Sequence, residues 1–290
     1  MSAALSQSRT GQRNRVLLFF RRYPLATLGL VLVLICVFAS LAAPLFTDVD
    51  PNKIDPAVRL SPPGTLGHPL GTDEAGRDIL SRMLHGGRIT LFVGFAASLI
   101  ATLFGSSIGL LAGYSNIVMD NVLMRLMDIV LAFPFILLAI MIVAFAGPGL
   151  LNTLIAVAIV NIPFYARIIR SSVVTTREAE YIVAAVSLGA KPLGIIFKHL
   201  LPAALPLIIV TASINVGWMI TQSAALSFLG LGTQPPTADW GTMLGQGKQY
   251  LTVAPHAATI PGVAIFVVVL GFNLLGDGVR DALDPRLKKR

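Results

Sequence analysis

The stretch IVLAFPFILLAIMIVAFAGPGLLNTLIAVAIVNIPFYA, residues 129–166, contains no charged side chain. A membrane-spanning helix needs about 20 consecutive, mostly apolar residues, so this stretch is too long for a single crossing. Gly147, Pro148 and Gly149 lie near its middle and are typical of a tight turn. The stretch therefore predicts a hairpin of two membrane-spanning helices, near residues 127–145 and 150–169.

The composition of the whole chain also indicates a membrane protein. Hydrophobic residues make up 55% of the 290 residues and charged residues only 12%, with a mean hydropathy of +0.78. A soluble domain usually has about a quarter charged residues. Four further apolar runs of suitable length lie at residues 25–46, 89–113, 205–228 and 255–276. We therefore expect an all-α polytopic membrane protein with six transmembrane helices, the first of them a retained N-terminal anchor.

Lysine and arginine residues indicate the orientation of these helices, because cytoplasmic segments are enriched in them. The N-terminal tail, the segment after the fourth helix and the C-terminus are basic, and six crossings place all three on one side. We therefore expect cytoplasmic termini, with tails at residues 1–24 and 281–290. The net charge is +8, and the basic residues that cause it lie beside apolar runs. The sequence has no basic patch interleaved with aromatic residues. Nucleic acid is therefore not an expected partner.

Few residues indicate chemistry. The four histidines lack the spacing of metal ligands, and the chain has neither a Walker A loop nor a G-x-S-x-G motif. Asp128 is the only ionisable residue near an apolar interior, where we expect it to pair with Arg125. The sequence thus predicts no catalytic residue and no metal site, and it places the energy source in another subunit. A stand-alone secondary transporter and a non-transporting membrane scaffold remain alternatives.

The outer loop, residues 48–88, has a helical pattern of its own near its end. Thr72 or Asp73 can cap a helix there, and the apolar residues at positions 79, 80, 83 and 84 share one face. Gly86 and Gly87 are typical of a helix end. We therefore expect an amphipathic elbow helix at the outer surface, either as a structural element or as a docking site for an external partner.

A second patterned segment, EYIVAAVSLGAKPLGIIFKHLLP, follows the fourth apolar run at residues 180–202. A short helix over residues 178–188 is expected to end at Gly189, in the left-handed conformation. Pro192 suits the first turn of a second helix, which runs to Leu200 before Pro202 and Pro206 mark the entry to the fifth span. The prediction is a rigid corner that can insert into a partner and transmit a push.

This corner resembles the EAA loop of permease subunits of binding-protein-dependent ABC importers. Five positions match the family pattern at the right spacing: Ala184, Ala185, Gly189, Leu201 and Pro202. Val183 stands where the family has Glu, although Glu180 lies three residues earlier, and His199 replaces an Ile. Without this Glu the chain lacks the side chain for a specific salt bridge to the ATPase, but docking itself does not depend on it.

Four other blocks are similar to the second permease of dipeptide and oligopeptide importers. They lie at residues 70–94, 123–140, 226–244 and 274–287. The resemblance implies a type I ABC importer permease fold in the bacterial inner membrane, with residues 89–280 as a five-helix core and residues 178–200 as the coupling loop. The implied partners are a sister permease, two ATP-binding subunits that hold ATP and magnesium, and an external solute-binding protein. No cofactor is implied for this chain.

The resemblance also implies roles for individual residues. The ATPase-docking set is Glu180, Val183, Ala184, Ala185, Gly189, Pro192, His199, Leu201 and Pro202. The outer side chains expected to face the binding protein are Asp73, Arg77, Asp78, Pro235 and Trp240. Candidates for the solute path are Asn161, Asn215, Gln222 and Ser223, together with Asn152, although interhelical hydrogen bonding explains them equally well. Ser223 lies where the family often has Glu. The solute itself, whether dipeptide, oligopeptide, glutathione or nickel chelate, is not determined.

Overall fold

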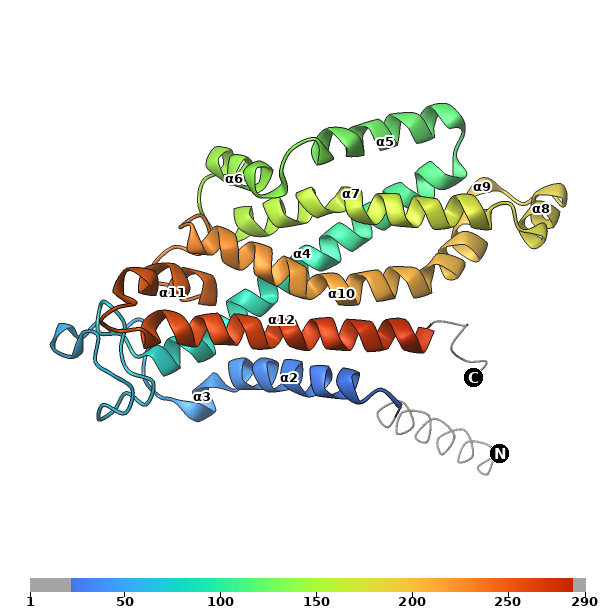
Figure 1. Ribbon diagram of the computed structural model, residues 1–290. Coiled ribbons are helices and arrows are strands. Elements are labelled where there is room, and N and C mark those ends of the chain that lie inside the picture. Colours follow the sequence, from blue (N-terminus) through green and yellow to red (C-terminus); the bar gives the residue numbers. More distant parts are fainter. Residues whose placement is uncertain (1–21, 284–290) are drawn as a thin grey trace, which may run out of the picture.

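The computed structural model describes residues 22–283, and helices form its framework (Figure 1). The predicted tails lie largely outside this range, at residues 1–21 and 284–290. The elements in chain order are α2 (Pro24–Leu41), α3 (Ala43–Phe46), η1 (Pro56–Val58), α4 (Ile79–Tyr114), α5 (Ile117–Leu131), α6 (Phe135–Ala146), α7 (Leu150–Thr176), α8 (Glu180–Ser187), α9 (Pro192–Ile195), η2 (Ile196–Leu200), α10 (Leu201–Phe228), α11 (Trp240–Gly247), η3 (Lys248–Tyr250) and α12 (His256–Leu283).

Within residues 22–283, five helices are long and apolar enough to cross a membrane, and the α5–α6 pair makes six if it counts as one span. The prediction of six spans agrees with the upper of these two counts, but the third is not the straight helix predicted over residues 127–145. The axes of α5 and α6 differ by 88°. The break precedes Phe135, because Pro134 has no amide hydrogen and disfavours a helical conformation at Phe133.

The predicted hairpin between the third and fourth spans is confirmed. Gly147 and Gly149 have positive φ angles of 91° and 150°, which only glycine adopts readily. The Asn152 side chain donates hydrogen bonds of 2.8 and 2.9 Å to the carbonyl oxygens of Ala146 and Gly147. Asn152 was considered as a residue of the solute path, but its side chain closes this turn instead.

Helices α4 and α7 form the most extensive pair in the bundle. Gly105, Gly109 and Gly113 lie one turn apart on the face of α4 that contacts α7. A Cβ atom at Gly109 would lie 2.6 Å from the carbonyl oxygen of Ala166. The two backbones are therefore in direct contact, as expected for small residues between membrane helices.

The separate elbow helix predicted for the outer loop is absent from this region. Asp78 caps α4, which runs without a break through Gly86 and Gly87. The glycines are there for close packing: a Cβ at Gly86 would lie 3.2 Å from the Ala238 backbone, and one at Gly87 would lie 2.8 Å from the Trp240 ring. The prediction was wrong because Gly86 and Gly87 do not end a helix. They allow residues 238–240 of the same chain to pack closely against α4.

The bundle has two distinct ends (Figure 1). The segment between α3 and α4 lies with α11 at one end, here called the loop end. The start of α2, the end of α12 and the pair α8–α9 lie at the other, here called the corner end. The two ends of the described chain thus share one end of the bundle with the predicted coupling loop.

Candidate functional site

The corner between α7 and α10 has the turn that the sequence predicts. Gly189 follows α8 with a φ angle of 82°. Its amide donates to the carbonyl of Val186 at 2.9 Å, and the amide of Ala190 donates to that of Ala185 at 3.1 Å. These two hydrogen bonds form a Schellman motif, so Gly189 fixes the direction in which the chain leaves α8.

The second arm of the corner begins as predicted and ends differently. Pro192 occupies the first turn of α9. The helix does not stop at Leu200, because the π-helical turn η2 continues it directly into α10. Pro202 and Pro206 therefore lie inside one helical run, and the predicted boundary was wrong. Proline is tolerated within membrane helices where a local π adjustment satisfies the backbone groups that it leaves unpaired.

The corner is packed firmly against the membrane helices. Ile182 of α8, Ile195 of α9 and Leu200 of η2 are buried in one cluster with Ile169 and Val173 of α7. The rings of Tyr181 and His199 join the two arms, with centroids 6.2 Å apart. Arg177 Nη1 donates to the carbonyl of Gly113 at 2.9 Å, which links the corner to the end of α4. A displacement of the corner must therefore move several spans together.

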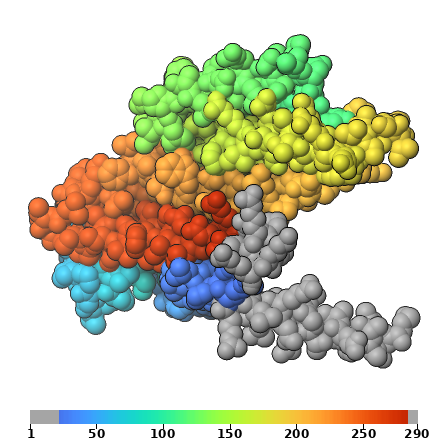
Figure 2. Space-filling view, turned by 45° about the vertical axis from the view of Figure 1, so that its right-hand side comes forward, coloured from blue at the N-terminus to red at the C-terminus, as the bar shows by residue number. Residues whose placement is uncertain are grey.

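The corner projects from the bundle (Figure 2). Its outer surface is apolar. Its exposed hydrophobic residues are Tyr181, Val183, Val186, Leu188, Leu193 and Phe197, with Leu188 exposed by 89%. Glu180, Ala184, Gly189, Pro192 and Pro202 are exposed too, while Ala185, His199 and Leu201 are partly buried. An exposed apolar patch of this kind is typical of a protein–protein contact. At position 183 this surface carries a valine side chain, where the family pattern has the carboxylate of Glu.

Three of the five predicted path residues come together in a second region. Asn161 of α7 donates to Gln222 Oε1 of α10 at 2.7 Å, and both side chains are buried. With Asn215 they line a cleft of about 390 Å³, here called the amide cleft. Its other lining residues are apolar or aromatic: Val130, Leu131, Phe133, Phe135, Val160, Phe164 and Trp218.

Ser223 lies apart from the amide cleft, so its assignment to the same path is not supported. Its hydroxyl is buried and donates to the Ile220 carbonyl at 3.4 Å. The side chain lines a separate small pocket together with Thr90, Thr153 and Asp239. One residue along a helix turns a side chain by about 100°, which explains why the neighbours Gln222 and Ser223 face different surroundings.

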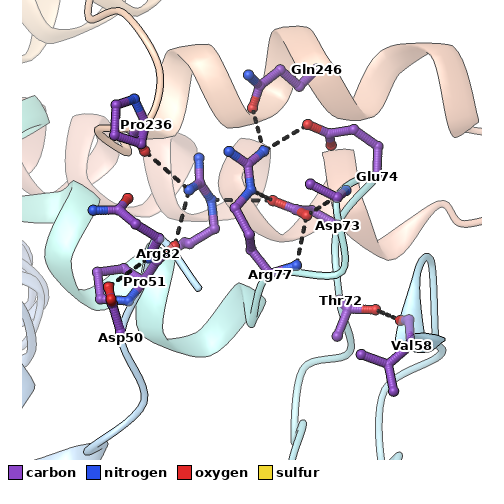
Figure 3. Close-up of polar contacts among 12 residues, drawn as sticks. Asp50, Pro51, Val58, Thr72, Asp73, Glu74, Arg77, Arg82, Pro236 and Gln246 are labelled. Atoms are coloured by element: carbon purple, nitrogen blue, oxygen red, sulfur yellow. Dashed lines mark hydrogen bonds and ion pairs between the residues drawn. The ribbon is translucent and has the colours of Figure 1, made fainter. Parts of the chain in front are cut away.

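A buried charge cluster organises the loop end (Figure 3). Asp73 Oδ2 accepts a 2.7 Å hydrogen bond from Arg77 Nε and lies 3.3 Å from Arg82 Nε. Arg82 also donates from Nη1 to the carbonyls of Pro51 and Pro236, at 3.1 and 3.3 Å. These contacts join three separate segments of the loop end. Asp73 and Arg77 are each only 6% exposed, so the expectation that they contact an external partner was wrong.

Two further residues expected to face the binding protein are also buried. Asp78 Oδ2 accepts from the Ser81 amide at 2.7 Å and caps α4. Trp240 Nε1 donates to the carbonyl of Met83 at 2.8 Å. Their polar groups are used inside the chain: Asp78 caps α4 and contacts His68 of the outer loop at 3.0 Å, and Trp240 joins α11 to α4. Pro235 is exposed and remains the one candidate of the original five.

The sequence interpretation missed α11 and the ion pair between Asp128 and Arg167. Asp239 caps α11 through the amides of Gly241 and Thr242, and an aspartate at a helix start is a signal that could have found it. Asp128 lies 3.7 Å from Arg125 as predicted, but a 2.5 Å hydrogen bond joins it to Arg167, 39 residues away. No local pattern indicates such a partner. Among residues 22–283, no group of three His, Cys, Asp or Glu side chains could hold a metal ion.

Comparison with protein families decides the class of the molecule. Residues 105–289 match the family described as the binding-protein-dependent transport system inner membrane component. Residues 12–63 match the N-terminal TM domain of oligopeptide transport permease C. The chain is a permease of this transport family. Membership agrees with the multi-pass arrangement of the apolar helices.

Relatives with names of their own match nearly the whole permease. It is 47% identical to the dipeptide transport system permease protein DppC of Alkalihalophilus pseudofirmus over 92% of its own length and 88% of that protein. It is 45% identical to the di/tripeptide transport system permease protein DppC of Pseudomonas aeruginosa, over 90% and 88%. The glutathione transport system permease protein GsiD of Pectobacterium atrosepticum is 44% identical, over 93% and 89%. These relatives are named for different solutes.

Solved structures agree on the fold. The permease resembles chains from two crystal forms of the MetNI methionine ABC transporter in inward-facing conformations. One match has a TM-score of 0.54 at 24% identity and covers 69% of the permease and 95% of the other chain. The second has a TM-score of 0.57 at 22% identity and covers 70% and 96%. The predicted all-α fold of an ABC importer permease is therefore confirmed.

Proposed function

We propose that the permease works with a sister permease and two ATP-binding subunits as an importer of peptides or a related small solute. It resides in the bacterial inner membrane and receives the solute from an external binding protein. The observation that carries this proposal is the corner, which joins an exposed apolar surface to a rigid attachment on three spans. Relatives named for dipeptides, di/tripeptides and glutathione support a solute with peptide bonds.

In this proposal the corner end lies in the cytoplasm and docks an ATP-binding subunit. ATP and magnesium are held by those subunits, and this chain contributes no cofactor site. Val183 cannot form a salt bridge, so docking relies on the exposed apolar side chains around Leu188. Burial of such surface stabilises a contact by about 25 cal/mol per Å² before the costs of association. Closure of the ATPase pair then moves the corner and the spans packed on it.

The loop end lies outside the membrane in the same proposal. There Pro235 and the neighbouring exposed residues 234–237 meet the binding protein. The charge cluster around Asp73 supports this surface from beneath, because it joins the segments that carry it.

The solute path runs along the α7–α10 face that holds the amide cleft. The amides of Asn161, Asn215 and Gln222 provide both hydrogen-bond donors and acceptors, which match the groups of a peptide bond. The aromatic side chains of the cleft suit a variety of solute side chains, since they offer apolar surface without a fixed polar requirement.

A two-step experiment tests the proposal. The tagged permease is purified from its native membrane in mild detergent, and the co-purifying proteins are identified. The complex is then reconstituted into vesicles with the binding protein and L-alanyl-L-alanine, and ATP hydrolysis and uptake are measured. We expect the sister permease and both ATP-binding subunits in the complex, and uptake that requires ATP and the loaded binding protein. Uptake by the chain alone without ATP would refute the proposal.

A matched pair of variants tests the docking surface. Leu188 at the corner end and Leu66 at the loop end are exposed by 89% and 98%, so neither substitution should disturb the fold. We expect Leu188→Glu to lose the ATP-binding subunits from the purified complex, and Leu66→Glu to retain them. Equal retention of the ATP-binding subunits by both variants would contradict docking at the corner.

A further inference from the structure

Beyond the amide cleft, a second cleft follows on the same side of α7. It has a volume of about 600 Å³ and is called the hydroxyl cleft here. Its lining residues are Arg167, Ile168, Ser171, Ser172, Thr175, Thr176 and Leu207. Along α7, positions 161, 164, 168, 171 and 175 recur every three or four residues and so share one helix face. The two clefts therefore lie along one face of α7 that leads from Asn161 toward the corner end. This face is here called the polar stripe, although Phe164 and Ile168 interrupt its polar side chains.

Arg167 is the only charged residue among the described residues that line either cleft. Its side chain is 51% exposed, although it belongs to a membrane-spanning helix. A charged side chain in a span normally faces a water-filled cavity or a protein partner, because hydrocarbon does not solvate it. The position of Arg167 between amides and hydroxyls therefore indicates a water-filled path.

The pairing of Arg167 is incomplete. Asp128 Oδ1 accepts a hydrogen bond from Nη2 alone, at 2.5 Å, and Arg125 also lies 3.7 Å from the same carboxylate. Two guanidinium groups thus share one carboxylate, which leaves a net positive charge beside the clefts. The other N–H donors of the Arg167 fork are not used by Asp128, and an exposed guanidinium can turn them toward a second acceptor.

A neighbouring ion pair shows what a complete clamp between the same helices looks like. Arg170 of α7 donates to both oxygens of Asp120 of α5, from Nε and Nη2, each at 2.5 Å. The Asp120 carboxylate is only 15% exposed, and Arg170 lines neither cleft. One pair is therefore closed and shielded, while the other is open and faces the polar stripe.

We infer that Arg167 binds a free carboxylate of the solute as it passes from the amide cleft to the corner end, and that it determines specificity for such solutes. Asp128 holds the guanidinium in place when no solute is present. A solute carboxylate accepts two parallel hydrogen bonds from the fork and replaces the single one from Asp128. The inference rests on the proposed function, since it assumes that the stripe is the path of a peptide-like solute.

The test uses the complete transporter in vesicles, with its binding protein and radiolabelled L-alanyl-L-alanine as the probe. Relative to the wild type, Arg167→Gln should lower uptake about tenfold or more, as expected for the loss of a charge-assisted hydrogen bond. Arg167→Lys should recover part of the uptake, and Arg167→Glu should lower it further. Asp128→Asn should lower uptake less than Arg167→Gln does, because it removes the stand-in carboxylate and leaves the guanidinium that binds the solute. ATP hydrolysis stimulated by the loaded binding protein should persist in all four variants.

The closed pair provides the matched control. Arg170→Gln and Asp120→Asn should lower thermal stability to a similar extent and should change uptake of the dipeptide equally, because the two halves of a clamp are equivalent. If Asp128→Asn impairs uptake as strongly as Arg167→Gln, the open pair is a clamp too, and the inference is overturned. If the Arg167→Gln complex lost the sister permease, Arg167 would be an interface residue, and the inference would be overturned as well.

Failure of the proposed function has a different result. It would appear in the wild-type transporter, as an absence of ATP-dependent uptake of the dipeptide. Wild-type uptake together with equal losses in Asp128→Asn and Arg167→Gln overturns only the role of Arg167 and leaves the importer assignment standing.

Discussion

The glycine ladder of α4 makes a quantitative prediction about the core of the bundle. In Gly109→Ala the new Cβ would lie 2.6 Å from the Ala166 carbonyl oxygen and 2.9 Å from Ile169 Cβ, where ordinary contact begins at 3.4 Å. The helices must separate, which costs about 1–3 kcal/mol for overpacking. Alanine recovers about 1 kcal/mol of helix propensity over glycine, so the net loss is about 0–2 kcal/mol.

Gly262→Ala isolates the clash from the propensity effect. Gly262 also lies inside a membrane-spanning helix, but its nearest neighbour, Leu244 Cδ1, would be 3.5 Å from a new Cβ. This variant should be as stable as the wild type, or more stable by up to about 1 kcal/mol. The two variants should therefore differ by about 1–3 kcal/mol.

The assay is thermal unfolding of the fluorescently tagged permease in mild detergent, read as the protein that remains in solution after heating. A difference of 1 kcal/mol corresponds to about 2–4 °C for a chain of this size class. Gly105→Ala combined with Gly109→Ala should cost less than the sum of the single effects, because one separation of the helices relieves both contacts. Gly109→Ala with the stability of Gly262→Ala would refute the proposed backbone contact.

Three further predictions concern the corner and the loop end. Gly189→Val should uncouple ATP hydrolysis from uptake and destabilise the corner by about 1–2 kcal/mol, because φ is positive at this residue. Gly189→Asn should have a smaller effect, since Asn tolerates positive φ better. Equal effects of the two variants would contradict the left-handed conformation of Gly189. Trp240→Ala should lower the free energy of unfolding by about 3–5 kcal/mol and Trp240→Phe by about 1–3, since Phe keeps an aromatic ring but loses the bond to Met83 and part of the indole volume; the order is checked by thermal unfolding, and its reversal would rule out a packing role. Asp78→Ala should lower the free energy of unfolding by about 0.5–2 kcal/mol and Asp78→Asn by less, because Asn keeps an acceptor for the first turn of α4. Equal losses of stability in the same thermal unfolding assay would show that the cap is unimportant.

The sequence alone determined the features that depend on local chemistry. Uncharged runs of sufficient length specify membrane helices, because unpaired backbone groups and charges are costly in hydrocarbon. Gly147 and Gly149 specify the hairpin between α6 and α7, and Gly189 with Pro192 specifies the corner, since each is required by the backbone at its own position. Both turns follow from the sequence without knowledge of any neighbour.

Features that depend on neighbours distant in the sequence were decided only by the tertiary structure. Gly86 and Gly87 appear as a helix end in the sequence, but they lie within α4 because another segment packs directly on them. Asp73, Arg77 and Trp240 are polar enough to suggest an outer surface, yet all three are buried. Arg77 and Trp240 donate hydrogen bonds to Gln246 and Met83, on other segments of the chain. The pairing of Asp128 with Arg167 likewise depends on how α5 lies against α7. A chain specifies its turns through each residue's own conformational limits, whereas burial and pairing are set by which helices meet.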